Sequence, residues 1–260
     1  IFFYTPRMPS PILLLALGPL SVIVFLLLEQ SRKTPKKTPF KRLRVFLVIA
    51  LLGLAVTTYA NSHLLIPLVS IFSPFEIMSV SSIGIPLYLN MILSFLLIDL
   101  CQYWVHRLHH KIPYLWRLHR LHHSDQDVDA LTTFLHHPIE YLTTFVISII
   151  LFILFDIPMI VIVLYSTIFS VHAAFSHTTL KINRQLERYL GYVIVTPSIH
   201  RLHHALAYED SNSNFGQVFS FWDRLFASYI KPSTTKKALV FGISKEQGPV
   251  ALSIKSFLIN

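Results

Sequence analysis

Histidines crowd into one part of this chain. Of its 14 histidines, 13 lie between residues 106 and 204, and many recur at spacings of three and four residues. On a helix, positions three and four apart share one face, so we expect each group to present two or three imidazoles to a common point. The groups are one HxxxH pair, His106 and His110, and two HxxHH triples, His119, His122 and His123, and His200, His203 and His204.

These residue types at this spacing point to metal binding. Imidazole nitrogen is the commonest protein ligand for zinc, iron, copper and nickel. The eight histidines of the three groups exceed what one tetrahedral ion requires, so they favour two ions with five or six ligands each. The alternative, a hydrogen-bonded or interfacial histidine, fits an isolated residue such as His63. We interpret His109 and His136, extra neighbours in their runs, as outer or solvent-facing residues.

Two polar residues precede the first histidine pair. Asp99, Tyr103, His106 and His110 would lie along one stripe of a helix. A carboxylate inside a membrane span is costly and usually functional. We therefore consider Asp99 and Tyr103 candidates for supporting the metal site, with Asp99 accepting the N–H of a ligand histidine. The alternative for Asp99 is an ordinary interfacial residue near a helix end.

The elements that must carry these residues are apolar enough for a membrane. Only 13% of the 260 residues are charged and 53% are hydrophobic, whereas a soluble domain has about 25% charged residues. Runs near the ~20 residues that cross a bilayer cover 11–28, 45–60, 83–104 and 140–175. The first has no small-residue cleavage site, which favours a span over a signal peptide. The last divides best at 156–158 into a two-helix hairpin that crosses or dips into the membrane.

Positive charge predicts the orientation. The loop 31–44 holds seven lysines and arginines, so the positive-inside rule places it in the cytoplasm. The connection 61–82 carries only Glu76 as a charge and is expected outside. Following the spans from there places every histidine group on the cytoplasmic side. The net charge of +9 is thereby accounted for, and nucleic-acid binding is not expected. With one cysteine, Cys101, no intrachain disulfide is possible.

Further ordered motifs accompany the histidines. They are Asp99 with 103–110, then 115–124, 137–140, 175–177, 195–204, 210–216 and 221–226. Together they resemble the fatty acid hydroxylase/sterol desaturase superfamily, and within it the bacterial sterol-desaturase-like branch, over about residues 83–230. One departure is the stretch 226–229, which reads Phe-Ala-Ser-Tyr where the family usually has Phe-Gly-Thr-Tyr.

The resemblance implies an all-α integral membrane protein with four to five transmembrane or hairpin helices and a cytosolic helical cap that holds a histidine-rich dimetal site. Residues 1–82 would form anchor helices and a basic loop, 83–230 the catalytic domain and 231–260 a tail. His172 competes with His137 for the tenth ligand position. The implied ligands are His106, His110, His119, His122, His123, His137, His177, His200, His203 and His204.

The same resemblance implies two iron ions that activate O2, although an all-nitrogen site also suits zinc in the isolated protein. We expect an O2-dependent oxidoreductase that hydroxylates or desaturates a C–H bond of a sterol, fatty acyl chain or related lipid. Electrons would arrive from a donor such as ferredoxin or cytochrome b5, because the sequence has no haem-attachment or flavin motif and its basic surface would attract an acidic carrier. The bacterial inner membrane is favoured, and the endoplasmic reticulum would satisfy the same topology.

Two alternatives stay open. A carotenoid ring hydroxylase or an ether-lipid monooxygenase would use the same metal chemistry on a different substrate. A non-enzymatic membrane metal-binding protein is a separate class. Metal carriers place their ligands within spans near the midplane, whereas the HxxHH triples lie in charged stretches beside the spans, which argues against transport.

Overall fold

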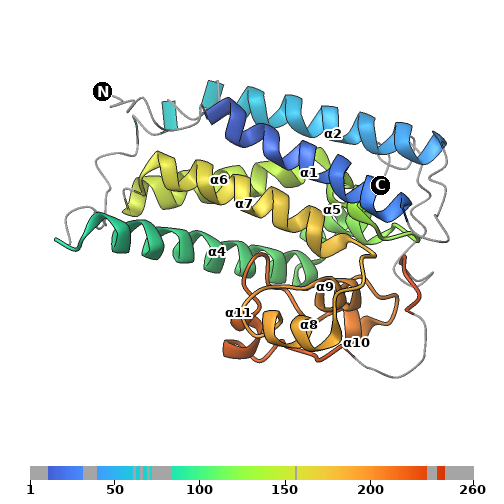
Figure 1. The fold of residues 1–260 in the computed structure, drawn as a ribbon. Coiled ribbons are helices and arrows are strands. Elements are labelled where there is room, and N and C mark those ends of the chain that lie inside the picture. The colour runs from blue at the N-terminus through green and yellow to red at the C-terminus, as the bar shows by residue number, and fades with distance from the viewer. Residues whose placement is uncertain are drawn as a thin grey trace.

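The structure is a computed structural model that describes residues 11–31, 40–60, 63–64, 67–68, 71, 84–155, 157–232 and 239–243. Within these residues the fold is helical, and the strand-like pairings are two isolated bridges, Ile194 with Phe219 and Ala205 with Phe241. Long helices lie side by side in one bundle, and short helices gather beside the end of that bundle (Figure 1). The expected all-α class is confirmed.

The bundle contains five long helices among the described residues. They are α1 (Pro11–Gln30), α2 (Phe40–Ala60), α4 (Leu87–Lys111), α6 (Pro138–Phe155) and α7 (Met159–His177). In the described part of the chain, four of them, α2, α4, α6 and α7, are long and apolar enough to cross a membrane, and α1 contributes a shorter apolar stretch, Ala16–Gln30. The expected division of the long apolar run is confirmed, because α6 ends at Phe155 and α7 begins after Pro158. Asp156 itself lies outside the described residues.

Apolar side chains hold the bundle together. A buried cluster joins α4, α6 and α7 through Ile98, Leu151 and Tyr165. Helix α1 packs closely on α7 at Gly18, where a Cβ would lie 2.7 Å from the Cβ of Ser170. Because no two carbons of this kind approach so closely, this contact requires the glycine.

The cap is made of short helices. They are α5 (Pro113–His123), the 3-10 helix η4 (Ala130–Phe134), α8 (Arg184–Leu190), α9 (Pro197–His203), α10 (Tyr208–Ser211) and α11 (Phe221–Leu225). Proline occupies the first turn of α5 and of α9, where its missing N–H has no helical partner to lose. Helix α4 runs beyond the expected end of its span at residue 104 to Lys111, and it therefore carries the first histidine pair into the cap.

The first two helices are tied to the cap by buried charges. Arg42 of α2 forms ion pairs with Asp125 at 2.7 Å and Asp129 at 2.8 Å. Glu29 of α1 accepts hydrogen bonds from the backbone N–H groups of Ala130 and Thr179. These contacts fasten the segments that follow α5 and α7. They also bring the end of the basic loop and an HxxHH motif to the same end of the bundle.

Candidate metal centre

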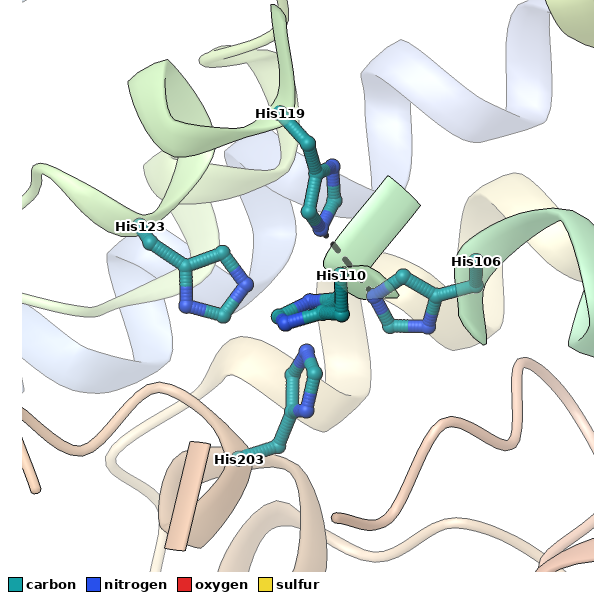
Figure 2. A group of neighbouring side chains, drawn as sticks. All are labelled: His106, His110, His119, His123 and His203. Carbon is teal, nitrogen blue, oxygen red and sulfur yellow. Dashed lines mark hydrogen bonds between the residues drawn. The ribbon is translucent and has the colours of Figure 1, made fainter. Parts of the chain in front are cut away.

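Five histidines from three helices converge at the first centre. His106 and His110 come from α4, His119 and His123 from α5, and His203 from α9, and their rings point toward a common point (Figure 2). One nitrogen from each ring lies within 4.8 Å of the others. All are buried except His110, which is partly buried. Such a set of nitrogen donors is suited to one metal ion.

Four further histidines form a second centre. His122 comes from α5, His177 from the last residue of α7, and His200 and His204 from α9 and its C-cap. The Nε2 atom of His177 lies 3.1 Å, 3.0 Å and 3.1 Å from the Nε2 atoms of His122, His200 and His204. All four residues are buried. Nine histidines that the sequence singled out are thus brought together, in groups of five and four.

Each HxxHH triple is divided between the two centres. His119 and His123 point to the first and His122 to the second, whereas His203 points to the first and His200 and His204 to the second. Each triple thus presents two of its imidazoles to one centre, as expected, and its third imidazole to the other centre. The reason is the helical period, because about 100° per residue leaves adjacent residues far apart in direction while i and i+4 differ by only about 40°. Helices α5 and α9 both face the two centres.

The hydrogen bonds of the rings show that their inner nitrogens lack protons. Nδ1 of His106 lies 2.9 Å from the carbonyl oxygen of Phe215, and Nδ1 of His119 lies 2.7 Å from a carboxylate oxygen of Glu140. These oxygens only accept, so each Nδ1 must carry the single N–H of a neutral imidazole. The Nε2 atoms of both rings are then unprotonated, and each has a free lone pair. These two Nε2 atoms lie only 3.1 Å apart. A shared cation would offset the repulsion between two lone pairs at this distance.

The second centre repeats this arrangement. Nδ1 of His177 donates to the carbonyl oxygen of Ala173 at 2.7 Å, which leaves its Nε2 without a proton among three other Nε2 atoms. The separations of 3.0–3.2 Å between these nitrogens also indicate the geometry. Metal–nitrogen bonds of about 2.1 Å give about 3.0 Å between ligands at right angles and about 3.4 Å in a tetrahedron. The observed separations are therefore close to those of nitrogens that share one ion.

Burial keeps the cap histidines neutral. Desolvation lowers the pKa of His203 to about 3 and holds the pKa of His122 and His200 well below the usual value. Desolvation also lowers the pKa of His119, although the carboxylate of Glu140 opposes this change. A proton is therefore a poor candidate for the shared cation. A metal ion fits, because it requires deprotonated ligands.

Glu140 organises the outer side of both centres. Its Oε1 accepts from Nδ1 of His119 at 2.7 Å and from Nδ1 of His136 at 3.1 Å. The ring of His136 stacks on His122 of the second centre, with centroids 4.1 Å apart. A carboxylate that accepts the outer N–H of a ligand histidine fixes both its tautomer and its ring orientation.

The outer position of His136 agrees with our interpretation of this residue. Sequence reasoning missed the role of Glu140, for which the i, i+4 pair with His136 at the start of an apolar helix was the available signal. His137 and His172 lie outside both groups of converging nitrogens in the described part of the chain. Nδ1 of His137 instead accepts the backbone N–H of Ile139.

Asp99 does not bond to a histidine in the structure, which corrects our expectation. Its carboxylate accepts from the Tyr165 hydroxyl, the Trp222 indole and the backbone N–H groups of Val218 and Phe219. Although Asp99 shares a stripe with His106, seven residues along a helix span about 10 Å, beyond the reach of an aspartate. Asp99 therefore fastens the cap to α4 and α7.

Tyr103 also acts indirectly. Its hydroxyl bonds to Ser228 at 2.8 Å and accepts from Arg107 at 2.9 Å. Its ring packs on Phe215, whose carbonyl accepts from His106. The carbonyl of Ser213 plays the same part for His203, at 2.7 Å from its Nδ1. Backbone acceptors of this kind leave no signal in residue types.

Comparison with known proteins gives a consistent result. An alkylglycerol monooxygenase from Xenopus tropicalis is 30% identical over 156 residues, which are 58% of this chain and 32% of that protein. The ornithine lipid hydroxylase OlsE from Rhizobium tropici is 26% identical over 147 residues, 56% of this chain and 44% of that protein. The human alkylglycerol monooxygenase is 25% identical over 155 residues, with 58% and 32% covered. This chain thus spans 32% to 44% of the length of these relatives.

No solved structure matches the chain. The family described as fatty acid hydroxylase matches residues 91–228, which include both groups of converging histidines and more than half of the chain. The chain belongs to the fatty acid hydroxylase family.

Proposed function

We propose that this protein is a membrane-bound di-iron oxygenase that hydroxylates or desaturates a C–H bond of a lipid. The observation that supports this most directly is the set of nine histidines in two adjoining groups, whose bare nitrogens face one another within a membrane protein of the fatty acid hydroxylase family. The proposed ligands of one iron are His106, His110, His119, His123 and His203, and those of the other are His122, His177, His200 and His204.

The chain's own residues have separate tasks in this proposal. When bound, the two irons would supply the activation of O2 that removal of hydrogen from an unactivated carbon requires. Glu140 and the carbonyls of Phe215 and Ser213 hold the ligand rings in one tautomer and one orientation. Burial of the histidines keeps them neutral and excludes water from the reacting groups.

The substrate is proposed to be a membrane lipid. Two of the relatives carry names that refer to alkylglycerol and one a name that refers to ornithine lipid. An ether-lipid substrate is therefore the specific candidate within this chemistry, beside sterol and fatty acyl lipids. Incubation of the protein in lipid bilayers with each candidate, O2 and a reductant distinguishes them by mass spectrometry. Gain of an oxygen atom indicates hydroxylation, and loss of two hydrogens indicates desaturation.

Electrons are proposed to come from a separate acidic carrier such as a ferredoxin or cytochrome b5, because the chain carries a net charge of +9. The metal centres are proposed to face the cytosol, in the bacterial inner membrane or the endoplasmic reticulum. The ion pair of Arg42 with Asp125 supports this orientation, since it joins the end of the basic loop to the segment after α5.

Metal content tests the proposal first. Elemental analysis of the detergent-purified full chain from iron-replete cells should give about two metals, with coupled iron in its Mössbauer spectrum. The variant His123→Ala should lose metal and lipid oxidation but still insert in the membrane, because its ring faces the first centre. His63→Ala is the matched control, since His63 is exposed and should change neither. Loss of metal in both variants, or no metal in the parent protein, would refute the assignment.

A further inference from the structure

The depth of part of the cap is set by a helix that crosses the membrane. A 25-residue helix such as α4 is about 37 Å long, whereas the hydrocarbon layer is about 30 Å thick. Asp99 lies five residues, about 8 Å, before Trp104, where the apolar run of α4 ends. Because its carboxylate accepts the N–H groups of Val218 and Phe219 and the indole N–H of Trp222, the segment 218–222 lies at a similar depth.

The same segment is bonded to the chain that follows α8. The backbone N–H of Ser220 donates to the Val193 carbonyl at 3.0 Å, and a guanidinium nitrogen of Arg224 donates to the Gly191 carbonyl at 2.7 Å. Figure 1 shows α11 beside α4 and α10 farther toward the end of the bundle where α4 ends. Residues near Val193 are thus closer to the membrane than those of α10.

Large apolar side chains are uncovered on α8, on the chain that follows it and on α11. We name them the basal patch: Leu186, Tyr189, Tyr192, Val193 and Leu225, which are between 51% and 66% exposed. The patch continues from the outer surface of α4, because exposed Trp104 contacts the ring of Phe226 at 4.9 Å between centroids. Leu225 is the next residue along the chain.

Positive charges accompany the basal patch. Lys181, Arg184 and Arg188 are exposed on and before α8. The one acidic residue among them, Glu187, is half-buried and accepts the backbone N–H of Ser198. Tyrosines and apolar residues next to lysine and arginine are typical of segments that lie in the boundary between lipid headgroups and acyl chains. Anionic lipids attract such charges.

We propose that the basal patch is a membrane-contact surface, which seats the cap in the headgroup boundary of an anionic leaflet. In this arrangement α8 and α11 lie in the lipid leaflet beside the metal centres, and the cap is partly embedded in the bilayer surface. A soluble protein partner is the other possible occupant. Lipid is favoured because the hydrogen bonds to Asp99 place segment 218–222 beside the membrane-crossing part of α4. At that position the lipid of the bilayer would exclude a soluble protein.

Fluorescence quenching in nanodiscs tests this placement. The full chain, with Cys101→Ser to remove the single native cysteine, receives one cysteine at Val193 and is labelled with an environment-sensitive dye. The nanodiscs contain phosphatidylcholine and phosphatidylglycerol, some with a nitroxide on the upper acyl chain. Tyr208→Cys on α10 is the matched control, because Tyr208 is 57% exposed but lies away from α4. Leu225→Cys provides a second reporter on a different helix.

We expect the dyes at Val193 and Leu225 to be quenched by the lipid nitroxide several-fold more than the dye at Tyr208. Aqueous iodide should show the opposite order. If iodide quenches the Val193 and Leu225 dyes as strongly as the Tyr208 dye, the patch faces water and the proposal is overturned. Equal lipid quenching at all three positions would also overturn it, since the cap would then lack the orientation argued from Asp99.

Discussion

Replacement of Glu140 tests whether the carboxylate holds the metal ligands in place. Its Oε1 accepts one hydrogen bond from His119 at 2.7 Å and one from His136 at 3.1 Å. In Glu140→Ala the buried N–H of His119 loses its acceptor, and its ring loses the contact that fixes the tautomer. Outer partners of this kind typically contribute about 10- to 100-fold to metal affinity, which corresponds to about 1.4–2.7 kcal/mol.

The loss of metal affinity in Glu140→Ala should differ between the two centres. His119 belongs to the first centre and bonds to Glu140 directly, whereas the second centre is reached only through the stacking of His136 on His122. We therefore expect the weaker-bound ion of the variant to be the one in the first centre. Glu140→Gln retains an acceptor oxygen without the charge, so its loss of metal affinity should be near the lower limit of about 10-fold.

Competition with a chromophoric chelator measures both affinities in the metal-depleted full chain, and elemental analysis gives the number of ions retained. Glu209→Gln is the control, because Glu209 is exposed on α10 and should bind metal like the parent protein. If Glu140→Ala binds two ions as tightly as the parent protein, the carboxylate does not position a ligand and the reasoning from its hydrogen bonds is refuted.

Three further predictions concern stability. Arg42→Met should lower the free energy of unfolding by about 3–5 kcal/mol, because it leaves the carboxylates of Asp125 and Asp129 without their buried partner; an unchanged denaturation curve would contradict this. Gly216→Ala should destabilise the cap by about 1–3 kcal/mol, since a Cβ there would lie 2.6 Å from the carbonyl oxygen of Phe219, and faster limited proteolysis of the cap would reveal it. Burial lowers the pKa of His203 to about 3, so below about pH 6.5 the unfolded chain binds a proton that the folded chain rejects. The metal-free protein should lose about 1.4 kcal/mol per pH unit from this residue as the pH falls from about 6.5 toward 3, and a flat stability profile over that range would be the contrary result.

Much of the fold could be read from the sequence because apolar runs and charge depend on local composition. Spans of about the expected length, the break near Pro158 and the helical setting of the histidine motifs all follow from hydropathy and the 3.6-residue period. The apolar run of α4 stops near Trp104, but the expected stripe from Asp99 to His110 already required the helix to continue. It continues to Lys111, because packing against the cap stabilises the polar turns that a span alone would not need.

The candidate site was also only partly predictable from the sequence. Nine of the ten histidines that the sequence singled out lie in the two centres, since their spacing on helices is a local property. His137 is the exception, because residues 135–137 are not helical and no period indicates which of two adjacent histidines turns inward.

The sequence by itself determined that the chain lies in a membrane, that its helices present histidines in groups, and which chemistry those histidines suit. Only the tertiary structure decided how each triple is shared between two centres, because that depends on how α5 and α9 are rotated against α4 and α7. It also decided that Glu140 supports His119 and that Asp99 fastens the cap instead of a ligand. Such pairings join residues from 21 to more than 100 positions apart, and no local pattern specifies them.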